Sequence, residues 1–125
     1  MYTVEEKRFF RDTALGAGRL GLNSQGAIVV RGKQIQAYGC SRRIVPKREY
    51  EISAIHDAIF GARDVSLAGA VIFSTYFPSL NDMVLILAVG ILRVYFMGEI
   101  SDTKTVDLIN CTKENNIPLE MIKLE

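Results

Sequence analysis

At 125 residues the chain is long enough to form one domain that buries its own core without disulfides or structural metal. Apolar residues make up 49% of the sequence and charged residues 23%, a composition that excludes the disordered and membrane-embedded classes of protein. Fifteen basic and fourteen acidic side chains give a formal net charge of +1, so no global field attracts nucleic acid or a membrane, and any anion site must be local.

The N-terminal half of the sequence predicts a helix, a hairpin and a second helix. Thr3 is a candidate helix cap with a glutamate three residues later, and the helix that it opens ends at the glycines near position 18. Two strand-like runs within 26–39 flank a short turn at 31–33, which is the layout of a β-hairpin. A loop over 40–48 follows, and the apolar spacing predicts a helix from about 49 to 62.

The C-terminal half alternates strands with helices. Apolar runs predict strands at 67–77, 91–97 and 117–124, and helices are predicted at 79–90 and 102–113. The element order is therefore α-β-β-α-β-α-β-α-β. After the hairpin, this alternation favours right-handed crossovers and a mostly parallel sheet with helices on both faces, an α/β fold.

A loop with a proline three residues before a helix start, and the segment STYFPSLND at 74–82, resemble the cytidine and deoxycytidylate deaminase superfamily. The resemblance covers nearly the whole chain. It implies a single domain over 1–125 with a three-layer α-β-α fold around a five-stranded mixed sheet. In that family the helix after the loop begins with His-Ala-Glu or Cys-Ala-Glu, and the next strand ends in Pro-Cys-x-x-Cys.

Carried over by position, the resemblance implies that the zinc ligands of the family are missing here. Glu49 stands where the family has its histidine or cysteine ligand, and Ser79 and Asp82 stand for the paired cysteines. Glu51 keeps the place of the general acid/base glutamate, and is catalytic only if the protein is active. With two further altered positions included, the expected ligand pocket comprises Ser41, Glu49, Glu51, Phe77, Ser79 and Asp82.

These replacements remove the chemistry on which the family depends. Zinc lowers the pKa of a bound water from about 15.7 towards about 7, and a glutamate alone cannot do so. Imidazole and thiolate are the donors that zinc prefers, whereas a serine hydroxyl is a poor ligand near neutral pH. We therefore expect no zinc, and no other cofactor, in this pocket.

Other residues offer only partial substitutes for the missing ligands. His56 follows Glu49 by seven residues, about 10 Å along a helix, which is too far to share one zinc ion, so we interpret it as structural. Cys40 lies in the loop and could reach inward, although a small buried apolar role suits it better. Glu49, Glu51 and Asp82 could instead hold Mg²⁺ or Mn²⁺, or could simply favour a helix N-terminus.

A basic loop precedes the expected pocket and has two interpretations. It could bind the phosphate of a nucleotide, because arginine pairs bidentately with phosphate oxygens. It could equally be solvated, or paired with Glu49 and Glu51. Its members are Arg42, Arg43, Lys47 and Arg48.

The predicted helix at 79–90 has almost no polar face after Asp82. A helix that is apolar all round must be covered on every side. One side faces the sheet, so we expect the other to contact a second subunit, making the protein a homo-oligomer. The alternative is coverage by the chain's own second or fourth helix.

These features predict a deaminase-like protein that has lost its zinc site and acts as an oligomeric module binding a nucleotide or nucleobase. The first alternative is an active deaminase or related hydrolase with atypical ligation and Glu51 as general acid/base. The second is a subunit that pairs with an intact deaminase. The apolar stretch 83–92 is too short to span a bilayer, and Cys40 and Cys111 fit free thiols, so we expect a cytoplasmic protein.

Overall fold

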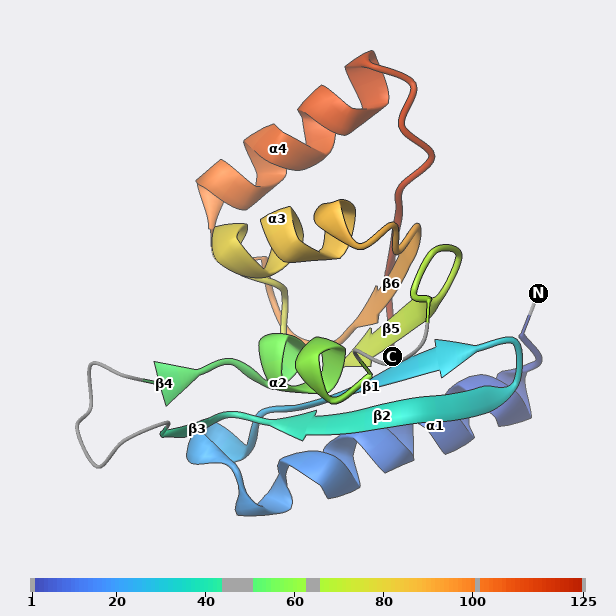
Figure 1. Cartoon of the computed structure of the whole chain (residues 1–125), viewed down its shortest axis with the longest axis vertical. Coiled ribbons are helices and arrows are strands. Elements are labelled where there is room, and N and C mark those ends of the chain that lie inside the picture. The colour runs from blue at the N-terminus through green and yellow to red at the C-terminus, as the bar shows by residue number, and fades with distance from the viewer. Residues whose placement is uncertain (1, 44–50, 63–65, 101, 125) are drawn as a thin grey trace.

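A computed structural model describes residues 2–43, 51–62, 66–100 and 102–124, which form a five-stranded sheet between helices (Figure 1). Two short 3₁₀ turns at Gly18–Leu20 and Leu22–Ser24 link the first helix to the first strand. The helices are α1 (Val4–Ala17), α2 (Ala54–Gly61), α3 (Leu80–Ala88) and α4 (Thr103–Glu114). The strands are β1 (Gly26–Arg31), β2 (Gln34–Cys40), β3 (Arg42–Arg43), β4 (Glu51–Ile52), β5 (Val71–Ser74), β6 (Arg93–Phe96) and β7 (Glu120–Lys123).

The main sheet has the strand order β2-β1-β5-β6-β7 and is mixed, as the resemblance implied. Within this sheet β2, β5, β6 and β7 run in the same direction, as a mostly parallel sheet requires, and β1 runs opposite to them and pairs antiparallel with both β2 and β5. The helix α2 connects β2 to β5, and these two strands run in the same direction with β1 between them. The pairs β5–β6 and β6–β7 are parallel, as helical crossovers require.

Two apolar clusters, one on each face of the sheet, make the three layers. On one face α1 contributes Phe10 and Ala14, which pack with Ile28 and Phe73 of the sheet. On the other face α2, α3 and α4 cover the alternate strand residues, among them Ile72 and Val94. Figure 1 shows α1 on one side of the sheet and the other three helices on the opposite side. The predicted α-β-α architecture is confirmed.

Local chemistry explains where two of the helices begin. The Thr3 hydroxyl accepts from the backbone N–H of Glu6 at 3.0 Å, and the Glu6 carboxylate accepts from the backbone N–H of Thr3 at 2.9 Å. Ser79 and Asp82 make the same reciprocal pair at the start of α3. Both are capping boxes, which satisfy backbone N–H groups that a helix leaves without partners. The predicted starts of these helices are confirmed.

The start predicted for the second helix is wrong. The structure begins α2 at Ala54, with Ser53 as its N-cap, and places Glu51 in the short strand β4. There Glu51 lies opposite Arg43 in an antiparallel pair with β3. Serine is a far better N-cap than glutamate, because its short hydroxyl reaches the backbone N–H groups of the first turn. Glu49 lies outside the described residues.

A close approach of α2 to strand β2 fixes the position of this helix start. A Cβ atom at Gly39 would lie 2.3 Å from the Ala54 carbonyl oxygen and 2.4 Å from the Ala58 nitrogen. Only glycine therefore permits the backbones to pack at this distance. The sequence analysis ended the strand at Gly39, whereas β2 continues to Cys40.

Candidate functional site

A cavity of about 310 Å³ opens between the N-terminal ends of α2 and α3. Of the six residues predicted for the ligand pocket, Glu51, Ser79 and Asp82 line it. The expected meeting of the segments around 51 and 79–82 is therefore present in the fold. The complete lining consists of Glu51, Ile52, Ser53, His56, Phe60, Ser79, Asn81 and Asp82.

The buried carboxylate of Asp82 is the centre of a hydrogen-bond network beside this cavity. Its side chain is 1% exposed. Its Oδ1 accepts from Ser53 Oγ at 2.5 Å and lies 2.8 Å from His56 Nδ1. Its Oδ2 accepts from Tyr76 Oη and from the backbone N–H of Ser79, both at 3.1 Å. We call these five residues the Asp82 network.

Two helix caps bring the members of the network together. Ser79 Oγ accepts from the backbone N–H of Asp82 at 3.2 Å at the start of α3. Ser53 Oγ accepts from the backbone N–H of His56 at 3.1 Å at the start of α2. Because the first turns of both helices meet at Asp82, its negative charge also lies near the positive ends of two helix dipoles.

The hydrogen bonds determine which nitrogen of His56 carries a proton. Ser53 has one hydroxyl proton, and Asp82 accepts it. Nδ1 of His56 lies 3.0 Å from that hydroxyl oxygen and 2.8 Å from the carboxylate, so it must be the donor in both contacts. In the neutral ring Nε2 is then the acceptor, and it is the nitrogen that can act on a ligand in the cavity.

The arrangement differs from a nucleophilic Ser-His-Asp triad. In such a triad the serine and the aspartate bond to opposite nitrogens of the ring. Here both contact Nδ1, and the Ser53 proton points to Asp82. Ser53 is therefore a capping residue and not an activated nucleophile.

Tyr76 completes the network from the end of the central strand. Burial, and then the charge of Asp82, raise the pKa of the Tyr76 phenol well above its usual range. The phenol therefore stays protonated and donates to Asp82. Its oxygen also accepts from the backbone N–H of Ile55 at 3.2 Å, which ties α2 to the segment after β5.

The donor set of the described residues does not fit zinc. In the described ranges no three His, Cys, Asp or Glu side chains gather closely enough to hold a metal ion. Both oxygens of Asp82 already accept two hydrogen bonds each, and Nε2 of His56 alone supplies one of the three or four donors that a zinc site needs. Zinc requires deprotonated nitrogen or sulfur donors that are directed at one point.

His56 lies closer to the site than its sequence position suggested. Seven residues from Glu49 seemed too far along a helix, but that argument placed the helix start at Glu49. Because α2 begins at Ala54, His56 lies in the first turn and reaches Asp82. Sequence reasoning also missed Ser53 and Tyr76, although a serine just before an apolar helical repeat is a cap signal.

Two of the predicted pocket residues lie outside the cavity lining. Ser41 donates its hydroxyl proton to Gln25 Oε1 at 2.8 Å. Phe77 is buried and packs edge-on against Phe96 with ring centroids 5.0 Å apart. Cys40, considered as a replacement ligand, is a free thiol whose backbone N–H donates to Asp57.

The basic loop is placed only in part. Arg42 donates to Asp57 Oδ1 from Nε at 3.0 Å and from Nη2 at 2.8 Å, so its described partner is on α2 and is not Glu51. Arg43 is exposed and lies opposite Glu51 in the β3–β4 pair. Lys47 and Arg48 lie outside the described residues. None of the described residues of this loop lines the cavity.

Solved structures of deaminases share this architecture. The dCMP deaminase of the cyanophage S-TIM5 is 20% identical, with a TM-score of 0.82 over 98% of this chain and 100% of that one. The chain has the cytidine deaminase-like fold. The same cyanophage enzyme has been crystallised in complex with dCMP and dUMP. No protein-family model and no curated protein matches the sequence.

Two further enzymes with the deaminase-like fold show its range. A diaminohydroxyphosphoribosylaminopyrimidine deaminase/5-amino-6-(5-phosphoribosylamino)uracil reductase from Thermotoga maritima is 21% identical, with a TM-score of 0.70 over 95% of this chain and 36% of that one. A structure from a study of tRNA:A34 deaminases is 17% identical, with a TM-score of 0.71 over 95% of this chain and 99% of that one. At identities this low the structural similarity establishes the fold alone, and any function has to be argued from the residues of the site.

The Asp82 network predicts an unusual sensitivity to one substitution. Asp82→Ala removes the acceptor of four donors, including the buried Tyr76 hydroxyl, and half of a capping box. We expect it to lower the free energy of unfolding by about 2–4 kcal/mol in urea titrations. The control Asp102→Ala removes the half-buried N-cap of α4, and should lower the free energy of unfolding by about 1 kcal/mol. Equal losses in the two variants would contradict a central role for Asp82.

Proposed function

We propose that this protein does not carry out zinc-dependent deamination and instead uses the deaminase-like fold to bind a nucleobase or nucleotide. The supporting observation is the Asp82 network. Asp82 stands at a cysteine position of the family motif, and both oxygens of its carboxylate accept hydrogen bonds from protein donors. A side chain whose lone pairs are already used has little left for a cation.

The lining of the cavity suits a flat heterocycle. Phe60 is 48% exposed at the cavity and offers an aromatic face for stacking. Glu51 and Asn81 line the cavity and are exposed. Both can accept hydrogen bonds from the edge of a base, and the amide of Asn81 can also donate one. A volume of about 310 Å³ is at the lower end of small-ligand pockets, which favours a single base over a larger ligand.

The first experiment separates binding from catalysis. Purified protein from zinc-supplemented medium should contain far less than one zinc per chain and release no ammonia from cytidine, dCMP, guanine or adenosine. At least one of these compounds, or the matching monophosphate, should raise the melting temperature. Asn81→Trp should abolish that shift by filling the cavity, whereas Asn110→Trp on the exposed face of α4 should preserve it. Stoichiometric zinc with turnover that Glu51→Gln abolishes would refute the proposal.

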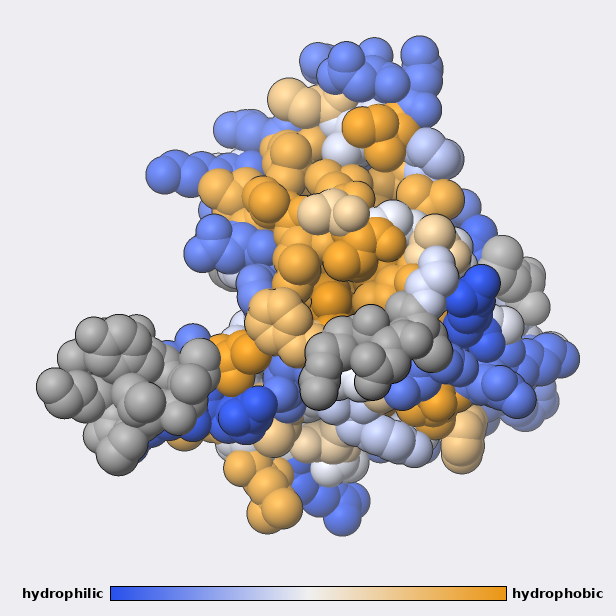
Figure 2. Space-filling model, viewed as in Figure 1, coloured by the Kyte–Doolittle hydropathy of each residue, from blue (hydrophilic) through white to orange (hydrophobic). Residues whose placement is uncertain are grey.

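The apolar surface of α3 supports an oligomeric form. Figure 2 shows hydrophobic side chains gathered over the region of α3 and the elements beside it. On α3 itself Val84 is 54% exposed, and Leu85 and Leu87 are only partly buried. The helix α4 covers one flank of α3 and leaves Val84 open. Contiguous apolar surface of this kind is typical of a subunit interface.

A charge placed on this surface should dissociate the oligomer. Val84→Asp is expected to shift the mass in light scattering to that of the monomer, since an interface core excludes charge. Val4→Asp is the matched control, because Val4 is 61% exposed at the first turn of α1 and an aspartate is favoured there. If wild-type protein is a monomer at high concentration and an intact deaminase co-purifies with it, the partner-subunit alternative replaces self-association.

The position of His56 supports a second candidate, a hydrolase that deaminates without zinc. Asp82 holds the ring through Nδ1, so Nε2 is available as a general base for a water molecule. The water would lose its proton to Nε2 and add to the ring carbon of the base, and ammonia would leave after protonation. Glu51 lines the same cavity and could donate the proton that the departing ammonia requires.

This candidate makes a distinct prediction for one variant. His56→Asn keeps a donor that can replace Nδ1 towards Asp82, but it lacks the base Nε2. If the wild-type protein releases ammonia from any compound of the panel, the rate should fall by a factor of about 100 or more in His56→Asn. His56→Gln, whose amide can occupy the Nε2 position without acting as a base, should be equally slow. Retention of the rate in both variants would exclude His56 as the base.

A further inference from the structure

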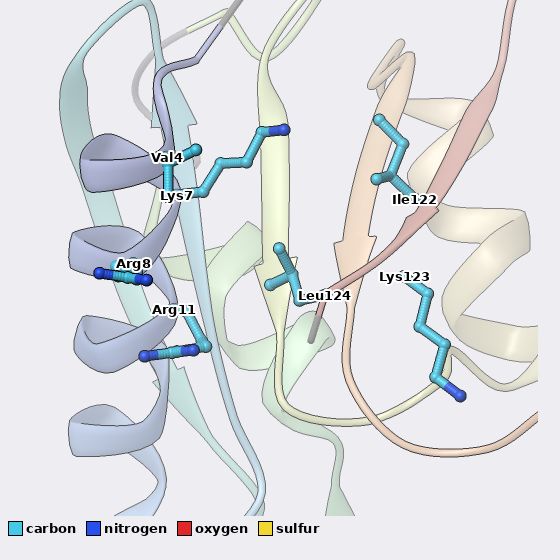
Figure 3. A pocket seen from close by; sticks show the side chains of 7 residues that line it. All are labelled: Val4, Lys7, Arg8, Arg11, Ile122, Lys123 and Leu124. Carbon is cyan, nitrogen blue, oxygen red and sulfur yellow. The ribbon is translucent and has the colours of Figure 1, made fainter.

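A second and larger groove lies on the opposite face of the sheet, between α1 and β7. Its volume is about 380 Å³. Figure 3 shows its side chains coming from the two elements, with the sheet between them and Lys7 extending from α1 across it. We call it the α1–β7 groove. It is lined by Val4, Lys7, Arg8, Arg11, Ile122, Lys123 and Leu124.

The charge of this groove is unusual for the protein. All four charged residues in its described lining are cations, although the chain carries fifteen basic and fourteen acidic side chains. Three of them lie on α1, where Lys7 precedes Arg11 by four residues and Arg8 precedes it by three. Residues so spaced share one face of a helix, so the groove has a cationic wall in a nearly neutral molecule.

Two ion pairs at the edges of the groove have an exposed acidic member. Arg11 contacts its neighbour Asp12, which is 64% exposed, at 3.0 Å. Lys123 contacts Glu99, which is 89% exposed, at 3.1 Å, and its side chain extends away from α1 in Figure 3. Exposed pairs of this kind contribute little to stability. The Nζ of Lys7 lies over the ring of Tyr95 at 5.9 Å, which directs it across the sheet.

The other wall of the groove is apolar. Ile122 on β7 and Leu124 just after it both pack against the cluster beneath α1, where they are half-buried. Met121, one residue earlier, packs against the opposite cluster. The groove therefore places cationic side chains on one side and an open apolar surface on the other.

We propose that the α1–β7 groove binds a phosphorylated small molecule of about mononucleotide size, with its phosphates towards Lys7, Arg8 and Arg11 and its apolar part on Ile122 and Leu124. Guanidinium groups hold phosphate oxygens through paired, charge-assisted hydrogen bonds. The volume lies within the range of small-ligand pockets. The groove shares no lining residue with the cavity beside Asp82, so this site is independent of the proposed function.

The test uses ATP as the probe in calorimetry at about 150 mM salt, where weak surface attraction is screened. Arg8→Glu should weaken ATP binding at least about tenfold, because it replaces a phosphate-binding cation by an anion. Lys104→Glu makes the same charge change on the exposed first turn of α4 and should leave the affinity within about twofold. Asn81→Trp, which fills the other cavity, should also leave it unchanged.

A second variant examines the apolar wall. Leu124→Ser should weaken the binding of ATP but not that of inorganic tripolyphosphate, which has no apolar part. Adenosine, which has no phosphate, should bind more weakly than ATP.

Circular dichroism and melting temperatures confirm that each variant is folded. The proposal is overturned if ATP shows no saturable binding, if Arg8→Glu binds ATP like the wild type, or if Lys104→Glu weakens it equally. Loss of ATP binding in Asn81→Trp alone would also overturn it and would assign the ligand to the cavity beside Asp82.

Discussion

The buried carboxylate of Asp82 is the interaction on which the site depends. A charged group that is almost wholly removed from water is tolerated only when its lone pairs are satisfied, and four donors from three segments satisfy this one. These donors come from the first turns of α2 and α3 and from the end of the central strand. The carboxylate therefore sets the distance between the two helix starts and, with it, the shape of the cavity between them.

Sequence reasoning was most successful where local chemistry decides the structure. The caps Thr3 and Ser79 were identified from short-range patterns, and the order of elements followed from apolar periodicity. The start of α2 was misplaced because the apolar spacing was extended back to Glu49, past the stronger capping preference of Ser53. The contact between His56 and Asp82 spans 26 residues, and only the packing of α2 against α3 produces it.

The two faces of the sheet carry different kinds of surface. One face holds the Asp82 network, whose polar groups are satisfied within the protein. The other holds the α1–β7 groove, where Arg11 and Lys123 pair with exposed carboxylates and Lys7 lies over the ring of Tyr95. The spacing of Lys7 and Arg11 can be read from the sequence, but a net charge near zero gave no indication of a local cationic surface. The groove depends on tertiary structure, because β7 pairs with β6 at the edge of the sheet that α1 does not cover.

A metal site and the Asp82 network place opposite demands on the same positions. Metal ligands must be deprotonated and must keep lone pairs directed at the ion, so part of the stability of such a site comes only when the metal binds. In the network, Ser79 and Asp82 cap a helix and satisfy buried donors, so they stabilise the fold with no ligand bound. Residues already committed to folding in this way are not held in reserve for a ligand. In our proposal the ligand contacts therefore come from the rest of the cavity lining, which includes Glu51, Asn81, Phe60 and Nε2 of His56.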